Sequence, residues 1–239
     1  MYKGRLFTFG CSFTSYHWPT WADILGREYD YFENWGRSGG SNQFIFNSLI
    51  EANARNKFTS QDTIAIMWTN VSRLDIYKDK NWYLPGNIYT TSVYNKEFLN
   101  NFTDYRGFLI RDFAIISATF DLLKYWNVQS LNFSMVPLHS DSIKQNWTIL
   151  KETDVLELYK ISEKVRPSVL EKIFNFDWHI VRDEPPLEFY DTHPRPKEHL
   201  KYLDAVLPEI SISENTRAWV NDYRYWENKT FPNYPKIRL

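Results

Sequence analysis

A serine near the start of the chain and an aspartate–histidine pair near its other end are residues that could carry out covalent chemistry together. Ser12 follows the apolar run "LFTF" and a glycine turn, and Asp191 and His193 lie in the loop "DTHP". A serine hydroxyl becomes a nucleophile when a base takes its proton and an acid orients that base. The three residue types therefore indicate acyl transfer. The alternative is a serine in an ordinary turn and a structural histidine beside a proline.

Two other segments could supply the hydrogen-bond donors that an acyl-transfer site needs for its oxyanion. Gly39 and Gly40 lie in the loop "NWGRSGGSN" before a predicted helix, where backbone N–H groups are free to point at an anion. Asn70 follows the apolar run "TIAIMW" and offers a side-chain N–H. On the alternative interpretation, the glycines form a turn and Asn70 caps a loop.

Strand-like and helix-like patterns alternate along the chain and predict an α/β fold with a parallel sheet and helices on both faces. Strands are expected at residues 5–9, 31–34, 63–68 and 128–136, and helices at 18–29, 42–57, 105–126, 197–206 and 214–226. Ligands bind at the carboxyl edge of the strands in open α/β sheets. Ser12, Gly39 and Asn70 each come just after a predicted strand, so all three should meet at that edge.

The length of 239 residues predicts a single α/β domain over residues 1–208, followed by an aromatic-rich extension at 209–239. Residues 75–104 read as irregular and 139–176 as helical and polar, so an insertion or lid is expected within about 75–104 and 139–190. The aromatic tail is a candidate docking segment, through which the chain could form a homo-oligomer.

Charge and cysteine content argue against several classes of protein. The 28 basic and 29 acidic residues give a net charge of −1 without a basic stripe, so no nucleic-acid partner is expected. One cysteine excludes an intramolecular disulfide framework, and the histidine spacing predicts no metal site. No cofactor is expected, because neither G-x-G-x-x-G nor a P-loop follows the first strand. No apolar stretch resembles a signal peptide or a membrane span, which predicts a cytoplasmic or virion-associated protein without a membrane partner.

The segments "FGCSFT", "NWGRSGGSN", "WTN" and "DTHP" resemble, in this order, the four sequence blocks of the SGNH (GDSL-type) hydrolase family. The resemblance implies a flavodoxin-like three-layer α/β/α sandwich. It also implies that Ser12 is the nucleophile, that Asp191 and His193 complete a catalytic triad, and that Gly39 and Asn70 join the Ser12 amide in the oxyanion hole.

The sequence departs from the family pattern at three of these blocks. In the last block, one residue separates Asp191 from His193 where two are common, although the shorter spacing also occurs in the family. Cys11 replaces the usual aspartate of the first block, and the third block reads "WTNVSR" without the usual glycine and aspartate. The segments "GCSFT" and "GGSN", with the strand end that precedes Arg73, are similar to small members encoded by phages and marine bacteria.

The resulting prediction is a serine esterase that forms an acyl-enzyme on Ser12, with an acyltransferase left open. The family resemblance suggests O-acetyl groups on carbohydrate as the substrate, and the 18% of aromatic residues in the sequence suits stacking on sugars. The alternative function is a catalytically silent protein of the same fold that binds a glycan or a partner subunit. Ser38 lies in a G-x-S-x-G motif, but such a nucleophile elbow normally follows several strands and only two precede it here.

Overall fold

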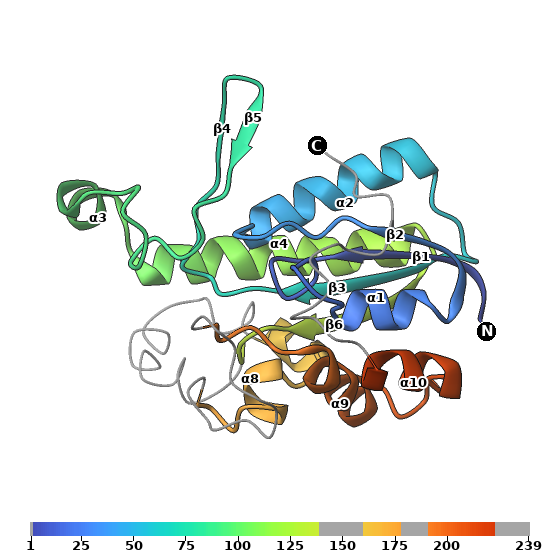
Figure 1. The fold of residues 1–239 in the computed structure, drawn as a ribbon. Helices are drawn as coiled ribbons and strands as arrows, with labels where there is room; N and C mark the ends of the chain where they lie inside the picture. The colour runs from blue at the N-terminus through green and yellow to red at the C-terminus, as the bar shows by residue number, and fades with distance from the viewer. Residues whose placement is uncertain (1, 139–159, 178–190, 223–239) are drawn as a thin grey trace.

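A four-stranded parallel sheet forms the centre of the computed structural model, which describes residues 2–138, 160–177 and 191–222 (Figure 1). The strand order is β2-β1-β3-β6. The strands span Tyr2–Phe9 (β1), Tyr29–Asn34 (β2), Thr63–Trp68 (β3) and Gln129–Ser134 (β6). In chain order this is 2-1-3-4, the order with which flavodoxin-like sheets begin. The predicted α/β fold class is confirmed.

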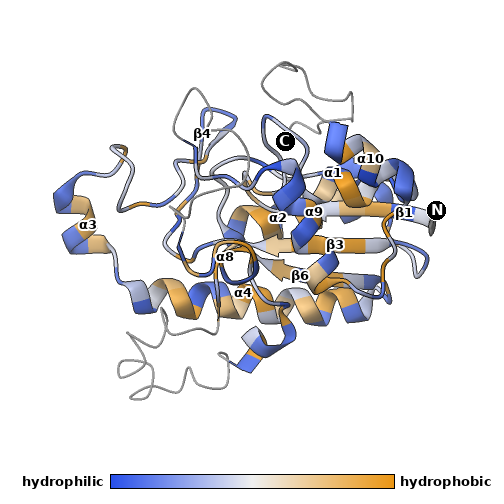
Figure 2. Cartoon of the chain, turned by 60° about the horizontal axis from the view of Figure 1, so that its bottom comes forward, coloured by the Kyte–Doolittle hydropathy of each residue, from blue (hydrophilic) through white to orange (hydrophobic). Residues whose placement is uncertain are grey.

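Strand β3 shows why the sheet is covered on both faces. Ile64, Ile66 and Trp68 pack into the core on one side, and Ala65 and Met67 pack into the core on the other. Successive side chains of a strand point to opposite faces, so a strand that is apolar at every position needs two covering layers. Figure 2 shows the hydrophobic strands between the more polar outer surfaces of the helices.

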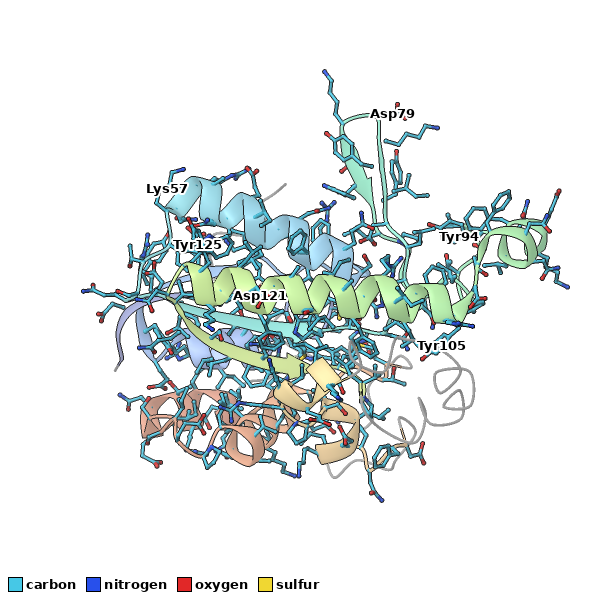
Figure 3. The ribbon with its side chains drawn as sticks, turned by 180° about the vertical axis from the view of Figure 1, so that it is seen from behind. Lys57, Asp79, Tyr94, Tyr105, Asp121 and Tyr125 are labelled. Atoms are coloured by element: carbon cyan, nitrogen blue, oxygen red, sulfur yellow. The ribbon has the colours of Figure 1, made fainter. Side chains whose placement is uncertain are left out.

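Helices form the two outer layers. On one face, α2 (Asn42–Asn56) lies beside the long α4 (Tyr105–Tyr125), as the view in Figure 3 shows. The opposite face is covered by α1 (Trp21–Gly26), α8 (Val169–Lys172), α9 (Pro196–Val206) and α10 (Glu214–Asp222). The loops at the carboxyl ends of the strands are left between these layers.

The helix predicted at residues 18–29 is shorter in the structure, and the strand that follows is longer. Helix α1 begins after Thr20, whose backbone N–H donates to Asp23 Oδ2 at 2.7 Å. It ends at Gly26, where an added Cβ would lie 2.5 Å from the Phe32 ring. Tyr29 already pairs with β1, so strand pairing overrides the helical spacing that extended the prediction.

Residues 75–104, predicted as irregular, contain regular structure. Strands β4 (Ile76–Lys78) and β5 (Asn81–Tyr83) form an antiparallel hairpin, and α3 spans Lys96–Phe102. The hairpin stands away from the main sheet (Figure 1). Its two turn residues, Asp79 and Lys80, both have positive φ values of 52° and 60°. Such turns normally use Asn-Gly or Asp-Gly, so the sequence lacked the usual signal.

The segment predicted as helical and polar at 139–176 is described only from residue 160. That part holds the 3₁₀ helix Lys160–Lys164 and helix α8. Residues 139–159 and 178–190, which include much of the predicted lid, lie outside the described residues. So does 223–239, the greater part of the predicted C-terminal extension.

The described part of the C-terminal extension, through α10, packs on the main domain. Ile212 and Val220 are buried in the core, and Ser213 Oγ donates to Glu28 Oε1 at 2.8 Å. The described residues after 208 therefore pack into the same core as the residues before it. None of the helices in the described ranges is long and apolar enough to cross a membrane.

Candidate active site

Ser12 lies in a tight turn at the carboxyl end of β1. The backbone N–H groups of Thr14 and Ser15 both donate to the Cys11 carbonyl, at 2.9 and 3.1 Å. Gly10 makes the turn possible, because a Cβ there would lie 2.0 Å from Thr14 Oγ1. The turn holds Ser12 at the sheet edge, with the residue only 5% exposed.

The structure brings Ser12, His193 and Asp191 together. His193 Nε2 is 2.9 Å from Ser12 Oγ, and His193 Nδ1 is 2.7 Å from Asp191 Oδ1. Asp191 Oδ1 also accepts the backbone N–H of His193 at 2.7 Å. When Nδ1 donates to the carboxylate, Nε2 is the acceptor for the serine proton. The His193 side chain is 26% exposed and the Asp191 side chain 6%, so the carboxylate is better shielded from solvent than the imidazole.

Asp191 is an anion in this arrangement. Burial by itself would raise the pKa of its carboxyl, but hydrogen bonds from His193 and Tyr16 outweigh burial and lower the pKa below its usual value. A charged carboxylate hydrogen-bonded to the imidazole stabilises the imidazolium that forms when His193 accepts a proton.

The loop after β2 lies beside the Ser12 turn. Trp35 N–H donates to the Thr8 carbonyl at 2.8 Å, and Arg37 N–H donates to the Gly10 carbonyl at 3.0 Å. These bonds extend the pairing of β2 with β1 beyond the strand ends. Gly39 follows in this loop with a φ of 82°, and an added Cβ would lie 2.1 Å from the Leu84 carbonyl oxygen. Only glycine fits this position.

Asn70 lies in the loop after β3, on the other side of β1 in the sheet order. Its Oδ1 accepts the Ser72 backbone N–H at 2.7 Å, which fixes the side chain and leaves Nδ2 as a donor. Within the described residues, neither Asn70 Nδ2 nor the backbone N–H groups of Ser12 and Gly39 donate to another group. The three predicted oxyanion donors are therefore uncommitted and follow neighbouring strands.

A buried methionine joins these loops, and sequence reasoning did not find it. Met135, directly after β6, has its sulfur 3.8 Å from Cys11 Sγ, from Thr69 Oγ1 and from an Arg73 guanidinium nitrogen. Arg73 also donates to the Gly40 carbonyl at 3.0 Å and is only 8% exposed. Cys11 and Thr69, the neighbours of Ser12 and Asn70, thus both contact Met135, and Arg73 links Met135 to Gly40, the neighbour of Gly39.

Three aromatic side chains after Ser12 hold the loop of His193, and they too were missed. Phe13 meets the His193 ring edge-on at 5.3 Å, and Trp18 Nε1 donates to the Pro194 carbonyl at 2.8 Å. Tyr16 stacks on His193. The only signal in the sequence was the density of aromatic residues in "FTSYHW".

Ser38 is not brought to a histidine in the part of the chain that the structure describes. It is an exposed residue of a turn closed by the Gly40 N–H and the Arg37 carbonyl, at 3.1 Å. Over the same described ranges, no group of three or more His, Cys, Asp or Glu side chains is arranged to hold a metal ion.

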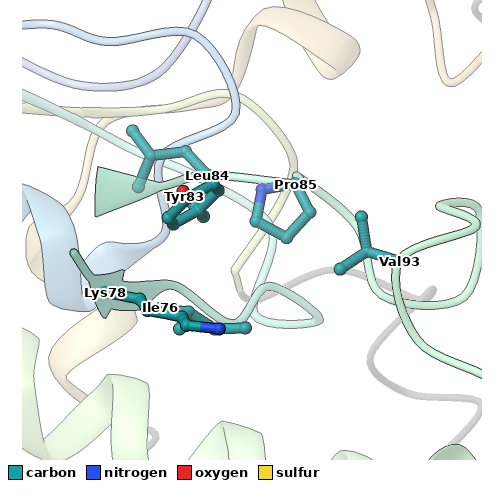
Figure 4. Close-up of a pocket in the computed structure, with 6 residues that line it drawn as sticks. All are labelled: Ile76, Lys78, Tyr83, Leu84, Pro85 and Val93. Carbon is teal, nitrogen blue, oxygen red and sulfur yellow. The ribbon is translucent and has the colours of Figure 1, made fainter. Parts of the chain in front are cut away.

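A cavity of about 500 Å³ lies at the base of the β4–β5 hairpin (Figure 4). Its walls are mostly apolar: Ile76, Lys78, Tyr83, Leu84, Pro85 and Val93. One of these residues, Leu84, has its carbonyl oxygen against Gly39. Leu84 therefore connects the cavity with the candidate oxyanion loop.

No family model matches the chain, and no curated protein matches it. Among solved structures, the chain is similar to a member of the lipolytic protein G-D-S-L family from Veillonella parvula. The sequence identity is 14%, the TM-score is 0.47, and the match covers 86% of this chain and 99% of that chain.

Proposed function

We propose that the protein is a serine esterase that hydrolyses carboxylic esters through an acyl-enzyme on Ser12. The observation that carries the proposal is the hydrogen-bonded series from Asp191 through His193 to Ser12, with distances of 2.7 and 2.9 Å. Nucleophile, base and orienting acid within hydrogen-bond reach of each other are the geometric requirement of this chemistry.

In the first half of the reaction, Ser12 Oγ attacks the ester carbonyl while His193 Nε2 takes the hydroxyl proton. Asp191 keeps the imidazole oriented and balances the charge that the proton brings. The tetrahedral intermediate collapses when His193 gives the proton to the departing alcohol oxygen, leaving the acyl group on Ser12.

In the second half, water takes the place of the alcohol. His193 Nε2 accepts a proton from the water as it attacks the acyl carbonyl, and then returns that proton to Ser12 Oγ. The carboxylic acid leaves and the enzyme is regenerated. An alcohol in place of water would give transesterification by the same steps, so exclusion of water decides between hydrolase and acyltransferase.

Both tetrahedral intermediates carry an oxyanion, and we assign its stabilisation to Ser12 N–H, Gly39 N–H and Asn70 Nδ2–H. All three donors are uncommitted among the described residues, and all follow strands that are neighbours in the sheet. Pre-aimed donors of this kind need no reorganisation when the charge develops.

For the substrate, we propose a small ester on carbohydrate, such as an O-acetyl group. The support is the cavity that Leu84 shares with the contacts of Gly39, where the Tyr83 ring offers a flat apolar surface of the kind that stacks on sugar rings.

The test is hydrolysis of short-chain p-nitrophenyl esters, together with mass spectrometry after treatment with a fluorophosphonate that labels activated serines. The wild type and Ser38→Ala should turn over ester and gain one label. Ser12→Ala should lose both, with kcat/KM lower by at least about 10⁴-fold. A wild type whose Ser12 is neither labelled nor acylated would refute the proposal.

A second candidate function is glycan binding without catalysis, and the exposed aromatic residues of the hairpin favour it. Tyr77 is 61% exposed and Tyr83 is 49% exposed. If the wild type hydrolyses no ester, its titration with acetylated and deacetylated oligosaccharides would separate the two functions. Binding that survives Ser12→Ala and weakens in Tyr83→Ser would support a binding protein.

A further inference from the structure

Tyr16 contacts both partners of Ser12, although nothing in the sequence assigned it a role. Its ring stacks on the His193 imidazole, with centroids 3.9 Å apart and planes at 16°. Its hydroxyl donates to Asp191 Oδ2. One side chain therefore lies against the face of the base and at the far oxygen of the orienting carboxylate.

Tyr16 completes the hydrogen bonding of Asp191. Oδ1 accepts two bonds from His193, one from the backbone N–H and one from Nδ1. Oδ2 has the Tyr16 hydroxyl as its donor. Burial, reinforced by the bond to Asp191, raises the pKa of Tyr16, so the hydroxyl keeps its proton and stays a donor. With both oxygens held, the carboxylate plane has no freedom to rotate away from the imidazole.

Neighbouring rings hold Tyr16 in this position. Trp18 meets its ring edge-on at 4.7 Å and is itself bonded to the Pro194 carbonyl, and His17 lies 4.7 Å from the same ring. The ionisable groups of the described residues around the His193 ring are thus Asp191 and Tyr16, with His17 behind Tyr16. The Phe13 ring contacts the rings of both His193 and His199 edge-on.

We infer that Tyr16 is a positioning residue of the Ser12 site, acting through Asp191 and His193 in two separable ways. This inference rests on the proposed esterase function. The hydroxyl locks Asp191 so that Oδ1 faces Nδ1, and the ring face fixes the imidazole plane with Nε2 toward Ser12. The ring face also attracts the positive charge of the imidazolium that forms when His193 holds the serine proton.

The two effects are separated by a pair of variants. Tyr16→Phe keeps the stacked ring and removes only the hydroxyl. We expect kcat to fall about tenfold with KM unchanged, because a hydrogen bond to a charged group is lost. The acid limb of the kcat/KM profile should move to higher pH, because Asp191 without this donor attracts the imidazolium more strongly. Tyr16→Leu also removes the ring. Its kcat should fall further, and its acid limb should lie at lower pH than that of Tyr16→Phe.

Tyr94→Phe is the matched control. Tyr94 is a buried tyrosine, and like Tyr16 its hydroxyl donates to a protein oxygen, here the Leu74 carbonyl at 3.0 Å. It lies by the hairpin and helix α3, away from the Ser12 site. This variant should keep the wild-type kcat and pH profile. Thermal unfolding of all three variants detects any loss of fold, and the downfield Nδ1–H proton signal of His193 reports the geometry directly by NMR.

The inference and the proposed function fail differently in this experiment. An inactive wild type with unlabelled Ser12 would overturn the esterase proposal. An active wild type, with folded Tyr16→Phe and Tyr16→Leu that keep its kcat, acid limb and Nδ1–H signal, would overturn the role of Tyr16 alone. A uniform rise in KM with unchanged kcat and pH profile would also overturn it, because positioning of the base acts on the chemical step.

Discussion

The candidate active site lies in the loops that follow β1, β2 and β3 and in the loop before α9, whereas the β4–β5 hairpin and α3 follow β3 alone. The two regions use their side chains in opposite ways. At the site, Ser12 is hydrogen-bonded to a histidine 181 residues away, and the Asp191 side chain is almost fully shielded from solvent. In the hairpin, Tyr77 is exposed and contacts Trp82, a residue of the same hairpin, at 5.2 Å. Contacts between distant parts of the chain form the site, whereas the hairpin is formed by local strand pairing, with the Trp82 ring also lying against Phe44 of α2.

This difference predicts that substitutions at the site remove chemistry, while substitutions in the hairpin leave both the chemistry and the stability of the main domain. Buried, hydrogen-bonded polar groups cannot be replaced without leaving a partner unsatisfied. Exposed aromatic side chains carry no such penalty when removed.

The largest expected effect is that of His193→Ala. Loss of the base should lower kcat by about 10⁴-fold, because the serine proton has no acceptor. The unfolding temperature should fall as well, because Asp191 loses the Nδ1–H donor of His193 and Tyr16 loses the ring on which it stacks. Steady-state kinetics with p-nitrophenyl acetate and a thermal melt measure both. A variant that keeps more than a tenth of the wild-type rate would show that another group is the base.

Asn70→Ala compares the two regions directly. Removing one oxyanion donor costs about 10²- to 10³-fold in kcat. Asn87 provides the control near the hairpin, because its Oδ1 accepts the Tyr89 backbone N–H at 3.0 Å, just as Asn70 Oδ1 accepts that of Ser72. Asn87→Ala should therefore show how much the free energy of unfolding falls when such a turn is lost, without any loss of kcat. Equal kinetic losses in the two variants would reduce Asn70 to a structural residue.

The buried carboxyl of Asp112 is expected to make the free energy of unfolding depend on pH. Its carboxyl is fully buried in α4; burial raises its pKa to about 6, although Arg111 and Asn42 act in the opposite direction. An unfolded aspartate has a pKa of about 3.9, so the native state holds the proton to higher pH than the unfolded state. The free energy of unfolding attributable to Asp112 should fall as the pH rises from about 4 to about 6, by about 2–3 kcal/mol.

Urea unfolding of the wild type and of Asp112→Asn across this pH range is the measurement. The asparagine variant cannot ionise, so its profile should lack the decline. Parallel profiles would show that Arg111, whose guanidinium is 2.6 Å from Asp112, keeps the carboxyl ionised throughout.

The smallest effect is expected for Tyr77→Ser in the hairpin. The free energy of unfolding should change by less than about 0.5 kcal/mol, because the side chain is exposed. Hydrolysis of p-nitrophenyl acetate should be unaffected, whereas KM for an acetylated oligosaccharide should rise if the hairpin contacts sugar. A loss of thermal stability comparable to that of a core substitution would mean that the hairpin is part of the main fold.

Much of the architecture was accessible from the sequence because its signals are local. Alternating and continuous apolar runs predicted all four strands of the sheet within a few residues, and helices α2, α4 and α9 followed from their periodicity. The errors have local causes as well. Strand pairing took Tyr29 away from the predicted first helix, and the Asp79–Lys80 turn lacks the glycine that marks most hairpins.

For the candidate site, sequence order was enough to identify which residues follow strands, and hence that Ser12, Gly39 and Asn70 share an edge. The residues that follow a strand lie within a few positions of it in the chain, so they can be identified from a single sequence. The family resemblance implied the meeting of Ser12 with His193, whereas the stacking of Tyr16 and the contacts of Met135 were not predicted. All three join positions that are far apart in the chain. Such contacts come from how loops pack on one another, and no local pattern encodes that packing.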